Sequence, residues 1–227
     1  MTSPARPGLA RPSRRALIGG LGGAVVTVGA GAGCSSRGAI VVVAPHPDDE
    51  VLRLTGYVLH ARDRGDDLVL VAVTDGEASG ARPPSWSRQH LVSVRTREQV
   101  NAWSLLTRGA GSVVRLGLPD GGLAENAVRD ALRPVLDARP GAVVAAASDV
   151  DDEHPDHRVV ARAVRGLAGA ASRTARPPGH PGGKRWDCPD TRAAEAADDS
   201  YSPFGHRSVP GLFDDLRAAR YASAVVA

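Results

Sequence analysis

The stretch AIVVVAPHPDDE, residues 39–50, decides the fold, because an uninterrupted apolar run leads directly into imidazole and carboxylate side chains. A second stretch has the same design: AVVAAA at 142–147 comes shortly before His154-Pro155-Asp156-His157. Each apolar run has the length and continuity of a buried strand. Two such clusters at the ends of two strands can converge on one metal ion, which is typical of a metal-dependent hydrolase.

Apolar runs and helical patterns alternate from Ala39 to about Ala170. Further strands are predicted at 68–73 and 112–116, and the predicted helices are 51–62, 87–106, 123–138 and 155–170. This alternation favours a Rossmann-like three-layer α/β sandwich with a mostly parallel sheet covered on both faces. Such sheets bind ligands beyond the carboxyl ends of their strands, where both clusters lie.

Three side chains of the clusters suit a catalytic zinc site, which needs three protein ligands and one open position. His46 and Asp49 are three residues apart at a strand-to-helix turn, so both can face one point. His157 can supply the third ligand from across the sheet. Imidazole and carboxylate ligands suit Zn²⁺, and also Fe²⁺ or other divalent ions.

The remaining cluster residues suit proton transfer. Asp48 is a candidate to take a proton from water, and His154 can stabilise an oxyanion or protonate a leaving amine. Asp156 can orient one of the histidines. The simpler alternative is that Pro-Asp-Asp-Glu only starts a helix and that each His-Pro pair is structural. The occurrence of both clusters at strand ends favours a site.

These motifs resemble the LmbE-like/PIG-L family of zinc-dependent N-acetylglucosamine deacetylases. Supporting matches are Thr74-Asp75-Gly76-Glu77, Arg95-Thr96-Arg97-Glu98 and Leu116-Gly117-Leu118-Pro119-Asp120-Gly121. The resemblance covers about residues 39–170, within a predicted deacetylase domain at 38–171.

The resemblance implies a role for each matching residue. His46, Asp49 and His157 would bind zinc, Asp48 would be the general base, and His154 would stabilise the tetrahedral intermediate with support from Asp156. Two further matching residues would contact the sugar, namely Arg95 and Asp120. Alternatively, Arg95 and Glu98 form an i,i+3 surface ion pair, and Asp120 only holds a turn.

The C-terminal segment, residues 172–227, is poorly patterned. Residues 172–199 combine Pro, Gly, Arg, Ala and Asp without an apolar period. Members of the family continue with further strands and an aromatic segment that shapes the substrate pocket. The sequence predicts no such continuation here, so we expect either a disordered tail or an irregular cover over the sheet.

The first 33 residues resemble a twin-arginine export signal, with Ser13-Arg14-Arg15-Ala16-Leu17-Ile18 before a Gly/Ala-rich apolar run. Gly31-Ala32-Gly33-Cys34 resembles a lipobox, although Gly31 stands where an aliphatic residue is preferred. We therefore expect an exported protein, either secreted or attached to the cell envelope through a lipidated Cys34. The alternative is a disordered tail on a cytoplasmic protein.

Composition excludes several other classes. The 227 residues can form one main domain, and the net charge of +3 comes largely from arginines before Cys34. No basic block with interleaved aromatics predicts nucleic-acid binding. Cys34 and Cys188 are the only cysteines, so no disulfide framework is expected, and no G-x-S-x-G motif occurs. The sequence carries no signal for an oligomeric state.

The sequence thus predicts zinc-dependent hydrolysis of the N-acetyl group of a GlcNAc-containing small molecule or glycoconjugate, giving acetate and a free amine. Two alternatives stay open. One is a non-catalytic lipoprotein that binds metal or sugar, and the other is a metal amidase that acts on a non-sugar substrate.

Overall fold

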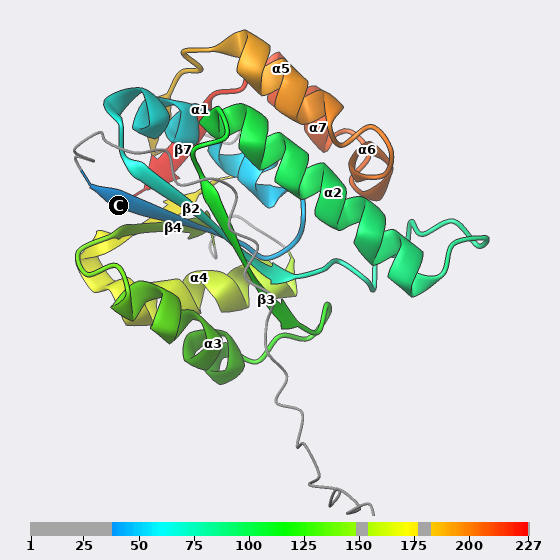
Figure 1. Ribbon diagram of the computed structural model, residues 1–227, viewed down its shortest axis with the longest axis horizontal. Helices are drawn as coiled ribbons and strands as arrows, with labels where there is room; N and C mark the ends of the chain where they lie inside the picture. Colours follow the sequence, from blue (N-terminus) through cyan, green and yellow to red (C-terminus); the bar gives the residue numbers. More distant parts are fainter. Residues whose placement is uncertain (1–37, 149–153, 177–182, 227) are drawn as a thin grey trace, which may run out of the picture.

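The computed structural model describes residues 38–148, 154–176 and 183–226. The predicted export signal and Cys34 lie outside the described residues. Seven strands form one sheet in the order β3-β2-β1-β4-β5-β7-β6 (Figure 1). The strands are β1 (Ala39–Ala44), β2 (Asp67–Thr74), β3 (Ser112–Leu118), β4 (Val143–Ala147), β5 (Ser172–Ala175), β6 (Lys184–Trp186) and β7 (Ser223–Val226).

The first four strands are parallel, as the sequence predicts, and so is β5, which the sequence does not predict. β1 lies at the centre, paired with β2 on one side and β4 on the other. The chain runs outward from β1 through β2 to β3, and then returns to the other side of β1 to form β4. This reversal makes the carboxyl ends of β1 and β4 the switch point of the sheet, the usual place for a ligand in an open α/β fold.

Helices cover both faces of the sheet, which confirms the three-layer α/β sandwich. Alternate residues of β1 face opposite layers: Ile40 and Val42 join one core, and Val41 and Val43 join the other. The first core packs against α1 (Asp49–Arg64), α2 (Arg88–Thr107), α5 (Thr191–Asp199) and α7 (Leu212–Ala218). The second core packs against α3 (Glu125–Asp137) and α4 (Pro155–Ala168), on the opposite side in Figure 1.

The expectation that the chain lacks a regular continuation after residue 171 is wrong. β5 extends the parallel sheet, and β7 and β6 add two antiparallel strands at its edge. The short helix α6 (Gly205–Ser208) lies between α5 and α7, and it completes the cover over one face. Aromatic side chains from this segment are fully buried, among them Tyr201 and Phe204. The segment therefore supplies both the strands and the aromatic residues that the sequence does not predict.

In residues 38–148, 154–176 and 183–226, every helix is too short or too polar to span a bilayer.

Candidate metal centre

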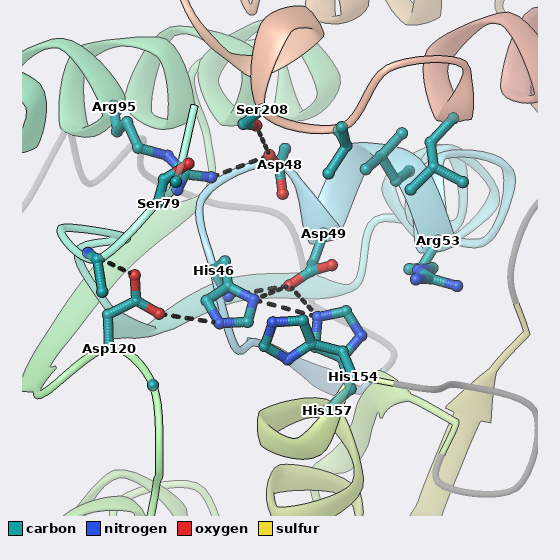
Figure 2. Close-up of a pocket in the computed structure, with 16 residues that line it drawn as sticks. His46, Asp48, Asp49, Arg53, Ser79, Arg95, Asp120, His154, His157 and Ser208 are labelled. Carbon is teal, nitrogen blue, oxygen red and sulfur yellow. Dashed lines mark hydrogen bonds and ion pairs between the residues drawn. The ribbon is translucent and has the colours of Figure 1, made fainter. Parts of the chain in front are cut away.

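The two sequence clusters meet at the carboxyl ends of β1 and β4 (Figure 2). The chain leaves β1 through a tight turn and starts α1 at Asp49, whose carboxylate accepts the backbone N–H of His46 at 2.9 Å. The second cluster forms the first turn of α4, where Pro155 occupies a position that needs no N–H donor. Both His46 and His157 are buried.

Three donor atoms form a triangle at this point. Nδ1 of His46 lies 3.1 Å from Nε2 of His157 and 3.5 Å from Oδ2 of Asp49, and Nε2 of His157 lies 3.3 Å from the same oxygen. A tetrahedral zinc ion with bonds of about 2.0–2.1 Å holds its ligand atoms about 3.3–3.4 Å apart. The triangle therefore fits one divalent ion with a fourth position open toward the pocket.

The other nitrogen of His46 has carboxylate partners. Nε2 lies 3.2 Å from Oδ1 of Asp120 and 3.4 Å from Oδ2 of Asp156. These carboxylates favour a proton on Nε2, which leaves the lone pair of Nδ1 directed at the triangle. Burial lowers the pKa of His46, but the neighbouring carboxylates raise it by more, to well above its ordinary value. The surroundings of His46 thus favour positive charge.

Two other groupings at the site also have metal-ligand character: His46 with His154 and His157, and His46 with Asp120 and Asp156. The second grouping uses Nε2 of His46, but the carboxylate of Asp156 already accepts other hydrogen bonds. Its carboxylate accepts backbone N–H groups from three residues of the loop after β3, namely Gly121, Gly122 and Leu123. The hydrogen bond with His46 and these amides hold the pKa of Asp156 far below its usual range. Asp156 therefore ties this loop to α4 and to His46.

Asp48 lies outside the triangle but lines the same pocket. Its Oδ2 accepts hydrogen bonds from Nη2 of Arg95 at 3.0 Å and from Oγ of Ser208 at 3.2 Å (Figure 2). Oδ1 has no hydrogen-bond partner among the residues that the structure describes. Burial raises the pKa of Asp48 to about 6, although the Arg95 guanidinium opposes this shift.

His154 lies beside the other two histidines, with its ring centroid 4.5 Å from that of His46 and 4.8 Å from that of His157. Its Nδ1 accepts the backbone N–H of Asp156 at 3.3 Å and so caps α4. A neutral imidazole that accepts at Nδ1 carries its proton on Nε2. Burial, followed by the charges of His46 and His157, lowers the pKa of His154. This ring can therefore donate a hydrogen bond from Nε2.

The two residues expected to contact a sugar both line the pocket, but both have internal partners. Arg95 also donates to the carbonyl oxygens of Pro47 and Gly76, at 2.6 and 3.1 Å. The alternative prediction of a surface ion pair between Arg95 and Glu98 is wrong, because both side chains are buried. Arg95 binds Asp48, and Glu98 binds the backbone N–H of Phe204. Asp120 accepts the N–H of Ala78 at 2.8 Å as well as contacting His46. These contacts favour positioning roles for Arg95 and Asp120.

The site opens into a pocket of about 430 Å³ whose lining includes residues that the sequence motifs do not identify. Arg53 lies one helical turn after Asp49 on α1, so helical spacing alone could have indicated it. Ser208 belongs to the C-terminal segment and lacks any sequence signal. One side of the lining is apolar and comes from Leu52, Val209 and Leu212.

The sequence profile of PIG-L, described as GlcNAc-PI de-N-acetylase, matches residues 41–168, which is more than half of the chain. The chain belongs to the PIG-L (LmbE-like) family. The matched range contains the whole donor triangle together with Asp48 and His154.

Relatives of this PIG-L protein include deacetylases. A probable N-acetyl-α-D-glucosaminyl L-malate deacetylase 2 of Bacillus anthracis is 35% identical over 69 residues. The match covers 30% of this chain and 30% of that protein, so the chain spans under a third of the relative's length.

Solved structures share the fold at low identity. The N,N'-diacetylchitobiose deacetylase of Pyrococcus horikoshii has a TM-score of 0.58 and 20% identity, over 83% of this chain and 82% of its own. The A40926 pseudoaglycone deacetylase Dbv21 has a TM-score of 0.61 and 16% identity, over 84% and 98%. GalB, a 4-carboxy-2-hydroxymuconate hydratase of Pseudomonas putida KT2440, has a TM-score of 0.62 and 17% identity, over 83% and 95%. Proteins with this fold catalyse more than one reaction, so function has to be inferred from the residues of the site.

Proposed function

We propose that this protein is a metal-dependent deacetylase that hydrolyses the N-acetyl amide of a GlcNAc-containing small molecule or glycoconjugate, with zinc as the metal. The observation that carries the proposal is the donor triangle of His46, Asp49 and His157 beside a buried Asp48 that is not part of it. The names of the deacetylase relatives support the choice of reaction and of sugar.

The donor set fits a divalent cation. Two neutral imidazole nitrogens 3.1 Å apart would direct lone pairs at the same point, which is favourable only with a cation or a proton between them. His46, Asp49 and His157 would hold the ion. When bound, it supplies Lewis acidity to a water molecule and to the acyl carbonyl.

Asp48 would act as the base, and His154 would stabilise negative charge. Oδ1 of Asp48 would take a proton from the attacking water, because Oδ2 is occupied by Arg95 and Ser208. Nε2–H of His154 would stabilise the negative charge on the carbonyl oxygen, since its Nδ1 is used in the α4 cap. The C–N bond then breaks, the amine takes up the proton that Asp48 accepted from water, and acetate and the free amino sugar leave.

The test is acetate release by the zinc-loaded protein from a panel of N-acetylglucosaminides, with non-sugar N-acetyl amides as a comparison. Asp48→Asn should abolish release while zinc content stays at the wild-type level, because Asn keeps the shape but cannot act as a base. His157→Ala should lose both zinc and activity. Full activity of Asp48→Asn, or a wild-type protein that binds no divalent ion, would overturn the proposal.

We also propose that the protein acts outside the cytoplasm, on a cell-envelope or secreted substrate. Arg14, Arg15 and the apolar run after them support export, and Cys34 supports lipid attachment. Replacing both arginines by lysine should keep the protein in the cytoplasmic fraction. Cys34→Ser should instead release an exported protein from the membrane fraction. Unchanged fractionation of both variants would contradict this location.

A further inference from the structure

The carboxylate of Asp48 is held by side chains from two separate helices. Arg95 of α2 and Ser208 of α6 both donate to Oδ2, at 3.0 and 3.2 Å, and in Figure 2 Arg95 reaches it from the left and Ser208 from above. A carboxylate that accepts a single hydrogen bond can rotate about its last bond, whereas two donors from different helices on the same oxygen restrict that rotation. The bound Oδ2 leaves Oδ1 as the oxygen that can accept a proton.

Ser208 has a local contact as well. Its hydroxyl also lies 2.8 Å from the carbonyl oxygen of Gly205, three residues earlier, so its single proton is shared between this carbonyl and Oδ2 of Asp48. The contact with Asp48 joins residues 160 positions apart in the chain. The contact with Gly205 does not require the hydroxyl of Ser208 to lie within hydrogen-bonding distance of Asp48, so the Asp48 contact is a separate feature of the site.

Glu98 fixes the segment that carries Ser208. Its Oε1 accepts the backbone N–H groups of Phe204 at 2.5 Å and Gly205 at 3.3 Å, where α6 begins. Phe204 is fully buried and packs with Leu91 of α2. The side chain of Glu98 is itself buried, which strengthens these hydrogen bonds.

One helix therefore controls both donors to Asp48. Arg95 and Glu98 are one turn apart on α2, so they point to the same side of the helix. Arg95 donates directly to Oδ2 of Asp48. Glu98 binds the backbone at the start of α6, the helix whose Ser208 contacts the same oxygen.

We propose that Ser208 is a positioning residue for the hydrolytic reaction: with Arg95 it holds Oδ2 of Asp48 so that Oδ1 faces the pocket, and Glu98 fixes the backbone that carries it. This inference rests on the proposed function, in which Asp48 is the base. It gives the C-terminal segment a direct part in the reaction.

Kinetics of Ser208→Ala and Ser208→Thr on the zinc-loaded protein test this role. The alanine variant should lose about 10-fold in kcat, with KM and zinc content unchanged, because the hydrogen bond to the Asp48 carboxylate is removed without loss of a substrate contact. The threonine variant keeps the hydroxyl and should restore most of kcat. Ser200→Ala is the matched control, since the hydroxyl of Ser200, at the C-terminal end of α5, donates to the carbonyl oxygen of Ala196 at 3.0 Å, as that of Ser208 does to Gly205.

The outcomes separate this inference from the proposed function. An active wild type with a fully active Ser208→Ala overturns the role of Ser208 and leaves the deacetylase proposal standing. If the wild type hydrolyses no amide, the proposed function fails, and crystal structures of both proteins decide the positioning role. We expect the Asp48 carboxylate to turn away from its wild-type plane in Ser208→Ala. An unchanged carboxylate overturns the inference.

Discussion

Asp48 adopts a backbone conformation that few residues other than glycine tolerate, with φ of 113°. Such a conformation costs on the order of 1–3 kcal/mol and persists where the surroundings require it. Here it separates two adjacent carboxylates: Asp48 turns to Arg95 and Ser208, while Asp49 turns back to His46 and His157. The strained turn thus lets neighbouring residues in the chain serve two different chemical roles.

Arg95→Lys should lower kcat about 10- to 100-fold without loss of zinc. The guanidinium donates in two directions, through Nη1 to Gly76 and through Nη2 to Pro47 and Asp48, and an ammonium cannot reproduce this fork. Steady-state kinetics with metal analysis measure the effect. Arg97→Lys, on the exposed side of the same helix, is the control. A kcat equal to that of the wild type would show that Asp48 does not need this arginine.

Helix α2 connects the site to the C-terminal segment through Glu98. Burial raises the pKa of Glu98 to about 7 from an ordinary value of 4.5, although the amides of Phe204 and Gly205 act in the opposite direction. Between these two pH values the folded chain binds the proton more tightly than the unfolded chain. The contribution of Glu98 to stability therefore decreases as pH rises from about 4.5 through 7.

Glu98→Gln should raise Tm relative to the wild type by more at pH 8 than at pH 5. The glutamine oxygen can still accept the two amides, but no charge has to be buried. Thermal unfolding at several pH values gives this difference directly. Glu195→Gln, an exposed change on α5, controls for the loss of one negative charge. A difference that stays constant with pH would mean that folding does not shift the ionisation of Glu98.

The elements up to residue 171 follow from local sequence, and those after it do not. Continuous apolar runs fix β1, β2 and β4, and the residues after them necessarily meet at one edge of a parallel sheet. In contrast, the buried positions of α5 include Ala194 and Ala197, whose small side chains give little apolar period. β6 has only three residues, Lys184-Arg185-Trp186. Tertiary contacts, not local pattern, place these elements, so Ser208 could not be predicted.

At the scale of the whole molecule, helix α1 links the metal centre to the C-terminal strands β6 and β7. This helix carries Asp49 at its start, and farther along it packs directly against the antiparallel strands β6 and β7. The aromatic rings of Tyr57 and Trp186 meet edge to face with centroids 5.0 Å apart. The backbone N–H of Tyr57 donates to Oγ of Ser223 at 3.4 Å. The segment after residue 171 therefore supports the helix that starts at the metal centre.

Gly56 permits this contact, and Gly56→Ala should destabilise the fold. A Cβ atom at this position would lie 2.3 Å from the carbonyl oxygen of Trp186 and 3.1 Å from the backbone nitrogen of Ser223, so α1 would have to move away from both strands. We expect a loss of about 1–3 kcal/mol in the free energy of unfolding, measured by urea titration.

The matched control for this prediction is Gly166→Ala, an exposed glycine inside α4, where a Cβ meets no atom closer than 3.4 Å. There the added methyl group should stabilise the helix by up to about 1 kcal/mol. Opposite signs for the same substitution would identify the close approach of β6 and β7 to α1 as the cause, because helix propensity acts equally at both positions. Two stabilised variants would instead mean that α1 does not lie against these strands, and the C-terminal segment would then not support the helix that carries Asp49.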